Sequence, residues 1–526
     1  MEFDEYIRSD WSEVKLGEIC EKAAKIKRKE VNPDEEFIYL DIGGIDNQSY
    51  RIVGYKKYHW KDAPSRAQQI VKVDDTLFST VRTYLKNIAI VDNPMYENQV
   101  CSSGFTVLRA INGLADSKFL FAFSLFEGFL RPLNKLQTGT SYPAVRDKDV
   151  FGQIIPLPPI PEQRAIVSKI EQLFSDLDNG INNFKNAQEQ LRIYRQAVLK
   201  KAFEGEFTKK WREEQTNLLS AKELLHQIIE EREKHYQKQL DEWKSALKYW
   251  EDNGKEGKKT TKPNKLKDVP QIENNEYQDF DILPDNWTWT RLASCVVDSQ
   301  SNIVDGPFGS NLQSAEYVKE GKPVLMIQNI KANQFIDKRI KYVTEKKFNS
   351  LLRHQFTNGD LIVTKLGDPL GLCCRVPKRF NEGVIVADLI RIKPSSENIN
   401  YDWLMYLINS QILQGQFRKI TKGTTRPRMN LTIMRNVILP LCSKEEQSQI
   451  VQEIETRLSI CDKMEATIAE SLQKAEALRQ SILKKAFEGK LLNETELEEA
   501  RNAPDWEPAK KLLERIKAEK KISRVK

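Results

Sequence analysis

The stretch LKKAFEG occurs twice in the chain, at residues 199–205 and again at residues 483–489. Each position of the second copy is numbered 284 higher than its counterpart in the first. The same offset relates EQRAIVSKIE, at residues 162–171, to EQSQIVQEIE, at residues 446–455. Identities that repeat in one register over this separation predict an internal duplication of the chain.

The duplication extends beyond these two stretches. TGTSYP, at residues 138–143, aligns at the same offset with KGTTRP, at residues 422–427. Nearer the start of each copy the offset drifts, and Trp11 aligns with Trp287 at an offset of 276. Small loop insertions would cause such a drift. We therefore expect two copies of one unit that together account for most of the chain.

Each copy begins with a segment of mixed pattern, at residues 1–155 and at residues 281–440. Short β-branched and aromatic runs, such as FIYL at residues 37–40 and LIVT at residues 361–364, alternate there with Gly, Asn and Asp turns. This pattern predicts an α+β domain. The first domain ends at PLPPIP, residues 156–161, because closely spaced prolines fit neither a helix interior nor a strand interior.

Two long helices are predicted after the mixed segments, within residues 156–207 and 441–491. Apolar residues recur there every three or four positions, as in a coiled-coil seam. A helix of about 38 residues would span roughly 57 Å. Duplicated helices in one chain pair most economically about a pseudo-twofold axis, which makes them antiparallel. Charged helical segments are expected to follow at residues 208–280 and 492–526, and the Gly- and Lys-rich residues 254–267 are interpreted as a linker.

Composition narrows the possible classes of protein. The net charge of +7 permits nucleic-acid binding without requiring it. The seven cysteines are scattered without a C-x-x-C pair, and the four histidines lie far apart, so neither a disulfide framework nor a zinc site is expected. No run of about 20 apolar residues could cross a membrane. The first residues lack the pattern of a signal peptide, and a cytoplasmic location is therefore expected.

Taken together, these features resemble the specificity subunit of Type I restriction and modification enzymes over essentially the whole chain. The most specific are PLPPIPEQRAIVSKI at residues 156–170 with its second copy, the repeated LKKAFEG, and LPDNW at residues 283–287, which opens the second half. The resemblance implies two target-recognition domains that each read one half of a split site in double-stranded DNA. It also implies helices that set the gap and dock two methyltransferase (M) subunits, with restriction/translocase (R) subunits as further partners. S-adenosylmethionine, ATP and Mg would then bind to the partners, and no cofactor to this chain.

Gly-punctuated loops that carry polar side chains are candidate DNA contacts, because such side chains read base edges. The first candidate is KGTTRPRMN at residues 422–430, with its counterpart at residues 138–146. The alternative is a solvated loop that caps the following helix. The second is GPFGSN at residues 306–311 together with QNIK at residues 328–331, for which an ordinary hairpin turn is the alternative.

Three further candidates, Arg82, Tyr84 and Lys365, come just after matching strands, although most surface cations contact only solvent. The full set of candidate DNA contacts is Arg82, Tyr84, Thr140, Ser141, Tyr142, Arg146, Ser310, Asn311, Gln328, Asn329, Lys331, Lys365, Lys422, Thr424, Thr425, Arg426, Arg428 and Asn430. Residues 281–440 contain 22 Lys and Arg against 14 Asp and Glu, whereas residues 1–155 are close to neutral. The second domain is therefore predicted to contribute more of the salt-dependent affinity.

The chain lacks the motifs of the catalytic chemistry that such a complex performs. NPMY at residues 93–96 has only one of the two prolines of an adenine-methyltransferase loop. GKEGKKT at residues 254–260 has the wrong spacing for a phosphate-binding loop. Asp360 and Lys365 have no second carboxylate at the spacing of a nuclease site. We therefore expect a non-catalytic specificity subunit, with a stand-alone DNA-binding regulator or architectural clamp as the alternative, and an enzyme with an unrecognised site as a third possibility.

Overall fold

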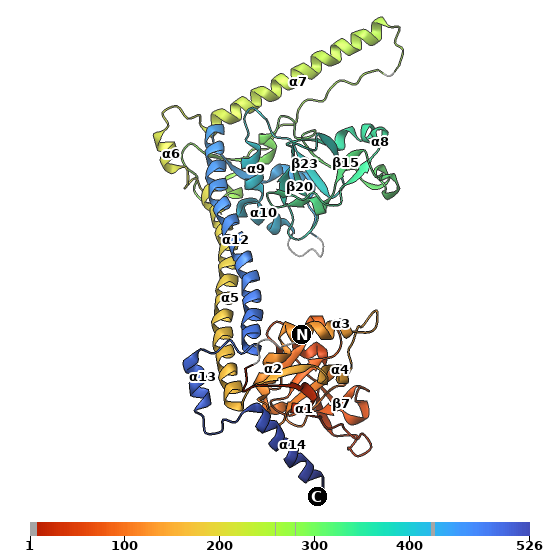
Figure 1. Cartoon of the computed structure of the whole chain (residues 1–526). Coiled ribbons are helices and arrows are strands. Elements are labelled where there is room, and N and C mark those ends of the chain that lie inside the picture. Colours follow the sequence, from red (N-terminus) through yellow and green to blue (C-terminus); the bar gives the residue numbers. More distant parts are fainter. Residues whose placement is uncertain (1–7, 258, 279, 422–426, 526) are drawn as a thin grey trace. The chain divides into compact units, whose positions relative to one another are not determined.

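The structure, a computed structural model, describes residues 8–525 apart from residues 258, 279 and 422–426. The chain divides into two compact units (Figure 1). Unit 1 contains residues 1–186 and 467–526, and unit 2 contains residues 187–466. Each unit combines β-sheets, short helices and parts of two long helices.

Unit 1 contains two four-stranded sheets. The first has the order β2 (Cys20–Glu21), β11 (Phe105–Ala110), β8 (Thr76–Ser79), β9 (Ile88–Ile90). The second has the order β6 (Lys56–His59), β3 (Glu36–Leu40), β10 (Val100–Ser102), β7 (Ala67–Ile70), and its β3 and β10 are parallel. Two smaller pairs are β1 (Ser12–Lys15) with β12 (Ile154–Leu157) and β4 (Ile45–Asp46) with β5 (Arg51–Ile52).

Unit 2 repeats this topology strand for strand. Its first sheet has the order β14 (Ile303–Asp305), β23 (Leu389–Ile392), β20 (Leu361–Thr364), β21 (Cys373–Arg375). Its second has the order β18 (Lys341–Val343), β15 (Lys322–Leu325), β22 (Glu382–Ile385), β19 (Gln355–Thr357), again with one parallel pair, β15 and β22. The smaller pairs are β13 (Thr288–Arg291) with β24 (Ile438–Leu441) and β16 (Ile330–Lys331) with β17 (Gln334–Phe335).

The composition of the internal strands β8 and β20 explains why these residues form strands. All four residues of β8, TLFS, are buried, and so are all four residues of β20, LIVT. Such β-branched and aromatic runs suit a pleated surface that is covered on both faces. Short helices complete the two domains: α1 (Leu16–Ile19), α2 (Ser117–Ser124), α3 (Glu127–Leu136) and α4 (Asp147–Phe151) in unit 1, and α8 (Glu345–Ser350), α9 (Tyr401–Ile408), α10 (Gln411–Thr421) and α11 (Leu431–Asn436) in unit 2. The predicted α+β class and the predicted duplication are confirmed.

The two long helices are α5 (Ile160–Phe203) and α12 (Lys444–Phe487), each of 44 residues and so somewhat longer than expected. Both end in the repeated LKKAFEG stretch. Gly205 and Gly489 adopt positive φ angles of 75° and 69°, which glycine tolerates without a steric penalty. The amide of Glu206 then donates to the carbonyl of Lys201 (3.1 Å), closing a Schellman cap. The glycine of the repeat therefore ends each helix.

A heptad seam runs along α12. Its buried side chains recur every seven residues, at Ile454 and Cys461 in unit 2 and at Ile468, Ala475 and Ile482 in unit 1. This spacing is typical of a coiled coil. The predicted seam is therefore present in the part of α12 that belongs to each unit.

Reciprocal ion pairs within the units give the direction of the helix pairing. In unit 2, Arg195 of α5 donates to Asp462 (2.5 Å) and Glu465 (3.1 Å) of α12. In unit 1, Arg479 of α12, the counterpart of Arg195, pairs with Asp178 of α5, the counterpart of Asp462. Each helix thus supplies the arginine once and the aspartate once, as an antiparallel pseudo-twofold pair requires. The predicted antiparallel arrangement is confirmed.

The C-terminal ends of the long helices are parts of the domain cores. In unit 1 the ring of Phe487 lies 5.0–5.4 Å, centroid to centroid, from those of Phe119, Phe123 and Phe126. In unit 2 the ring of Phe203 lies 6.2 Å from that of Trp403. Aromatic pairs at such distances add to the stabilisation that burial provides. Each core is therefore completed by a helix end from a distant part of the sequence.

Equivalent extensions follow both helix ends. α6 (Lys209–Glu214) and α7 (Ala221–Asp252) belong to unit 2, and α13 (Glu494–Arg501) and α14 (Ala509–Val525) belong to unit 1. The amide of Ala221 donates to the carbonyl of Asn286 (2.9 Å), and the amide of Ala509 donates to that of Asp10 (3.2 Å). Because these partners are themselves counterparts, the duplication includes the first turns of α7 and α14.

The described part of residues 254–267, interpreted as a linker, turns back from the end of α7 (Figure 1) and is hydrogen-bonded to this helix. Trp243 of α7 donates from Nε1 to the carbonyl of Thr260 (3.2 Å), and Trp250 donates to that of Gly257 (3.2 Å). Arg232 donates to the carbonyl of Lys267 (2.7 Å). The segment therefore packs back along the helix.

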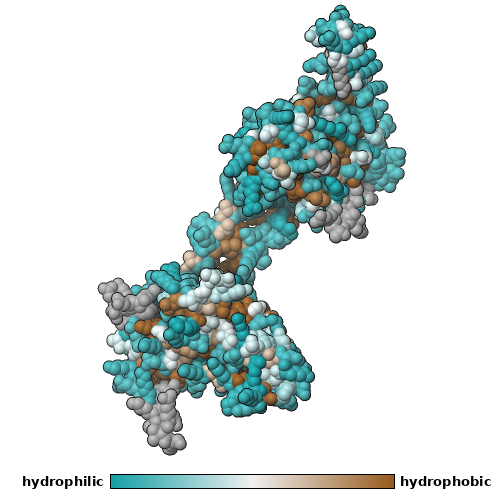
Figure 2. Space-filling model, turned by 90° about the vertical axis from the view of Figure 1, so that its right-hand side faces the viewer, coloured by the Kyte–Doolittle hydropathy of each residue, from teal (hydrophilic) through white to brown (hydrophobic). Residues whose placement is uncertain are grey.

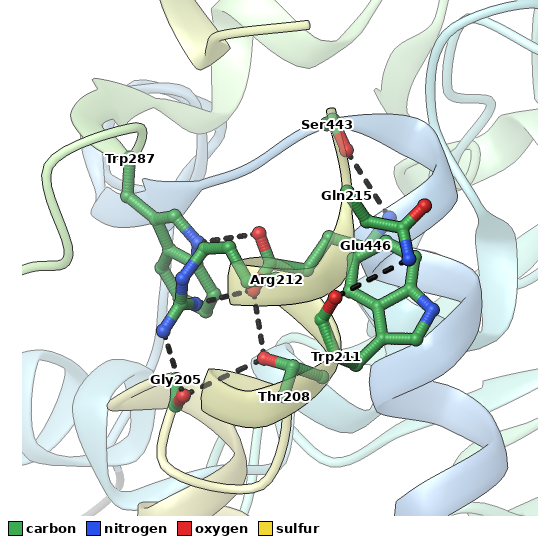
Figure 3. A network of polar contacts seen from close by, with 8 residues as sticks. All are labelled: Gly205, Thr208, Trp211, Arg212, Gln215, Trp287, Ser443 and Glu446. Atoms are coloured by element: carbon green, nitrogen blue, oxygen red, sulfur yellow. Dashed lines mark hydrogen bonds and ion pairs between the residues drawn. The ribbon is translucent and has the colours of Figure 1, made fainter. Parts of the chain in front are cut away.

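A buried carboxylate lies in the first turn of α12 (Figure 3). Glu446 is 0% exposed and accepts hydrogen bonds from Trp287 Nε1 (2.9 Å), Thr208 Oγ1 (2.7 Å) and Arg212 Nη1 (2.5 Å). Arg212 donates from its other terminal nitrogen to the carbonyl of Gly205 (3.1 Å). A buried charge with a cationic partner and further hydrogen bonds meets the conditions for stable burial. Glu446 thus connects α6, the start of the second domain and α12.

The counterpart in unit 1, Glu162, is buried in a different way. Glu162 is 0% exposed and accepts from Trp11 Nε1 (2.8 Å), but its Oε1 atom has no hydrogen-bond partner among the described residues. Burial raises the pKa of Glu162, and the nearby carboxylate of Asp10 raises it further. The two carboxylates therefore occupy equivalent positions in different electrostatic surroundings.

Candidate nucleic-acid interface

The two candidate loops lie in the same local framework in both units. In unit 1, Val81, just after β8, forms an isolated antiparallel bridge with Ala144. In unit 2, Leu366, just after β20, forms the same bridge with Arg428. The sequence predicts these loops and these strand ends as separate groups of DNA contacts. Within each unit the fold brings the two groups together.

Backbone hydrogen bonds around the bridges repeat as well. The amide of Val145 donates to the carbonyl of Thr80 (3.0 Å), as the amide of Met429 donates to that of Lys365 (2.9 Å). The amide of Arg82 donates to the carbonyl of Pro143 (2.7 Å), and the amide of Gly367 donates to that of Pro427 (3.4 Å). Since Pro143 and Pro427 are counterparts in the duplication, each unit attaches its loop to the strand end by the same bonds. We call this arrangement the bridge frame. It joins residues 80–82 to residues 143–145 in unit 1, and residues 365–367 to residues 427–429 in unit 2.

The bridge frame of unit 1 presents polar and aromatic side chains to solvent. Arg82 donates from Nη2 to the carbonyl of Ser141 (3.0 Å), and its Cζ atom lies 4.6 Å from the centroid of the Tyr142 ring. Tyr142 is 70% exposed and Tyr84 is 53% exposed. Thr140 and Ser141 are also exposed. Arg82, Ser141 and Tyr142 therefore form one cluster, with Thr140 next to it in the loop.

Arg146 and Asn430 follow the bridge frames at the starts of short helices. Arg146 is exposed and pairs through Nε with Asp149 of α4 (3.2 Å). Asn430 is exposed and caps α11, where its side chain accepts from the amide of Ile433 (2.8 Å). Asn430 thus has the capping role that was the alternative for these loops, whereas Arg146 occupies the N-cap position of α4 without a side-chain cap bond.

The bridge frame of unit 2 presents a different set of side chains. Arg428 is exposed, and its Cζ atom lies 5.7 Å from the centroid of the Phe308 ring. Lys365 is only 4% exposed, forms an ion pair with Asp305, and places its Nζ atom 4.4 Å from the same centroid. Because the charge of Lys365 is paired inside the protein, Arg428 is the exposed cation among the described residues of this cluster. Residues 422–426, which include the candidates Lys422, Thr424, Thr425 and Arg426, lie outside the described residues.

The remaining candidates of unit 2 divide into exposed and buried side chains. Gln328, Lys331 and Asn311 are exposed, and Ser310 lies in the 3-10 turn Gly309–Asn311. Asn329 is 0% exposed and donates to the carbonyls of Ile336 (2.9 Å) and Lys338 (3.0 Å). Its amide therefore stabilises the β16–β17 hairpin, the alternative that the sequence left open.

Phe308 is not among the candidate side chains, although it lies in the candidate loop GPFGSN, residues 306–311. Its ring is 47% exposed, and it contacts the cations of both Lys365 and Arg428. A Cβ atom on the neighbouring Gly306 would come within 2.2 Å of the carbonyl of Val386, so this glycine is required for close packing of the loop. An exposed aromatic residue within a glycine-punctuated loop was the available signal in the sequence.

Other features of the chain concern packing. All seven cysteines are buried. Burial raises the pKa values of Cys20, Cys295 and Cys374 to about 12, which leaves these thiols protonated at neutral pH.

Among the described residues no cluster of His, Cys, Asp and Glu could hold a metal ion, and no helix is long and apolar enough to cross a membrane. Hydrophilic residues cover most of the visible face of each unit (Figure 2).

Comparisons with known proteins agree with this organisation. The profile of the Type I restriction modification DNA specificity domain matches residues 8–184 and 312–474. The Type I restriction enzyme EcoBI specificity subunit of Escherichia coli is 23% identical over 403 residues, which are 77% of this chain and 72% of the relative. The crystal structure of the HsdS subunit from Thermoanaerobacter tengcongensis is 25% identical, with a TM-score of 0.53, over 93% of this chain and all of the relative.

A further solved structure, from work on complex assembly and conformational transition of the type I R-M system, is more similar in fold. Its TM-score is 0.67 at 25% identity, and the match covers 92% of this chain and 99% of the other. The profile matches more than half of the chain, once in each copy of the duplicated unit. The chain therefore belongs to the family of DNA specificity subunits of Type I restriction-modification systems.

Proposed function

We propose that this chain reads a DNA site of two separated halves, one half with each unit, and directs M and R subunits to it. The observation that carries this proposal is the bridge frame, which recurs in both units with different side chains. Unit 1 presents Ser141 and Tyr142 there, and unit 2 presents Arg428. Because base edges are distinguished by side-chain chemistry, one framework with two sets of side chains suits two different half-sites.

The duplication also supports a pair of docking surfaces. The first turns of α7 and α14 pack equivalently in their units, with Leu224 buried in one and Leu512 buried in the other. Two equivalent surfaces suit two copies of one partner, and we assign them to two M subunits. S-adenosylmethionine, ATP and Mg would bind to the partners, and this chain would contribute target recognition alone.

Long-read mapping of methylated adenines tests the proposal. A host that expresses the chain with its methyltransferase partner is compared with a host that expresses the partner alone. We expect methylation at a split motif with a fixed gap, and only when the chain is present. If an active partner gave no new methylation with the chain, a DNA-binding regulator or clamp would be the better account.

Loss of Arg428 and of Arg426, two positions earlier in the sequence, should weaken the salt dependence of DNA binding. Residues 281–440 carry 22 basic and 14 acidic residues, and Arg428 is exposed. Each phosphate contact contributes about 0.9 to the slope of log K against log salt. Replacing Arg426 and Arg428 by Ala should therefore reduce the slope by about 1 to 2. The slope is measured by titrating a labelled duplex at several salt concentrations, and an unchanged slope would refute this role.

A further inference from the structure

An exposed aromatic ring lies on a cation beside the bridge frame of each unit. Tyr142 is 70% exposed above Arg82 in unit 1, and Phe308 is 47% exposed beside Lys365 in unit 2. A single exposed apolar residue is ordinary on a protein surface. These two rings share a location and a mode of support, although they come from loops at different places in the sequence.

The ring of unit 1 is fixed by a constrained backbone. Arg82 adopts a left-handed conformation with φ of 49°, which is uncommon for a residue with a side chain. Its guanidinium is attached to the loop through the carbonyl of Ser141 (3.0 Å) and lies against the Tyr142 ring. The loop itself is closed by an antiparallel bridge between Thr138 and Ala144. Tyr142 therefore lies in a short turn that the Thr138–Ala144 bridge and the Arg82 side chain hold in place.

The ring of unit 2 is supported from inside the protein. Lys365 is 4% exposed and paired with Asp305, so its ammonium group is held in place beneath the Phe308 ring. Gly306 packs closely against the backbone at Val386 and anchors the base of the loop. Arg428 lies beside the ring and remains exposed. The cluster thus combines one buried cation, one exposed aromatic ring and one exposed cation.

An aromatic ring held in this way is suited to a direct contact with a DNA base. It offers an apolar surface for the thymine methyl groups at the base edges of the major groove, which phosphate-binding cations cannot recognise. Because the supporting cation already restrains the ring, little side-chain entropy is lost on binding.

Resting on the proposed function, we infer that Tyr142 and Phe308 each contact bases directly, one in each half-site. Arg82 and Lys365 act as positioning residues that support the rings. Arg428 supplies phosphate affinity next to one of them. Base discrimination and salt-dependent affinity then belong to different residues of the same cluster in unit 2.

The test compares the chain carrying Phe308→Ala with the unaltered chain, each in complex with its methyltransferase partner. Affinity is measured at several salt concentrations for two duplexes. One carries the mapped site, and in the other the half-site read by unit 2 is scrambled. We expect Phe308→Ala to lower affinity for the mapped site by about 5- to 100-fold, as the loss of one base-pair contact does, with unchanged affinity for the scrambled duplex and an unchanged salt slope. Phe308→Tyr should recover most of the loss, because it keeps the ring. Tyr142→Ala should act in the same way on the other half-site.

Tyr249→Ala is the matched control, because Tyr249 is a 73% exposed aromatic residue on α7, away from the bridge frame in sequence. It should leave both affinities unchanged. Full affinity of Phe308→Ala for the mapped site, or an equal loss on both duplexes, would overturn the inference while leaving the proposed function intact. If the unaltered complex itself failed to distinguish the duplexes, the proposed function would be overturned, and this inference with it.

Discussion

Glu446→Gln is expected to destabilise unit 2 by about 3 to 5 kcal/mol, since removing one partner of a buried ion pair leaves the other charge uncompensated. Arg212 is the partner that would remain, and its side chain is only 14% exposed. Thr208 and Trp287 also donate to this carboxylate, so α6 and the start of the second domain would loosen together. Amide hydrogen exchange of the variant is compared with that of the unaltered chain. We expect a loss of protection in α6 and the first turn of α7.

Glu162→Gln, at the equivalent position of unit 1, is the matched control and should have a small or stabilising effect at neutral pH. The glutamine keeps an oxygen that can accept from Trp11, and it removes a buried charge that has no ion-pair partner among the described residues. Comparable destabilisation by both substitutions would contradict the difference between the two sites.

The pH dependence of the Glu162→Gln effect follows from the raised pKa of Glu162. Burial, and then the neighbouring Asp10, raises this pKa above the usual 4.5, so the protonated form is favoured in the folded unit. Its contribution to stability is complete below about pH 4.5 and is lost as the pH rises through the folded-state pKa. The variant therefore gains stability relative to the unaltered chain as the pH is raised from about 4.5 towards 7. Chemical unfolding of both chains at matched pH values measures the difference.

Phe487→Ala is expected to destabilise unit 1 by about 3 to 5 kcal/mol, as is usual when a buried aromatic side chain is truncated in a core. Its ring is 0% exposed and packs among Phe119, Phe123 and Phe126. For a unit of this size the thermal transition should fall by roughly 6 to 15 °C. Hydrogen exchange should show that α2 and α3 lose protection while α9 keeps it.

Leu478→Ala is the control for this substitution, because Leu478 lies on the same helix and is 51% exposed. Its effect should be within about 0.5 kcal/mol. Equal loss of protection in both units after Phe487→Ala would contradict the prediction that Phe487 stabilises unit 1 alone.

Much of the fold could be predicted from the duplication alone. The repeat at an offset of 284 residues correctly predicted two domains of one topology and two long helices with one seam. Antiparallel pairing followed from symmetry, and the reciprocal pairs of Arg195 and Arg479 confirm it. These features depend on local periodicity and on identity between copies, which are visible in a sequence.

Features that depend on contacts between distant residues could not be predicted. Residues 254–267 have the composition of a linker, and only the tertiary contacts of Trp243 and Arg232 show that part of this segment packs along α7. Lys365 looked like an exposed candidate because its partner, Asp305, is 60 residues earlier in the chain. The side-chain amide of Asn329 makes this residue a candidate DNA contact, whereas its burial depends on the hairpin that follows it.

The central claim is that each unit reads its own half of a split DNA site. The measurement that tests it most directly is methylome mapping of a chimera in which residues 288–441 are replaced by the corresponding segment of another specificity subunit. Because β13 and β24 bound this segment, the exchange leaves the long helices unchanged. We expect one half of the methylated motif to change while the other half and the gap stay the same. A motif that changed in both halves, or in neither, would contradict the account.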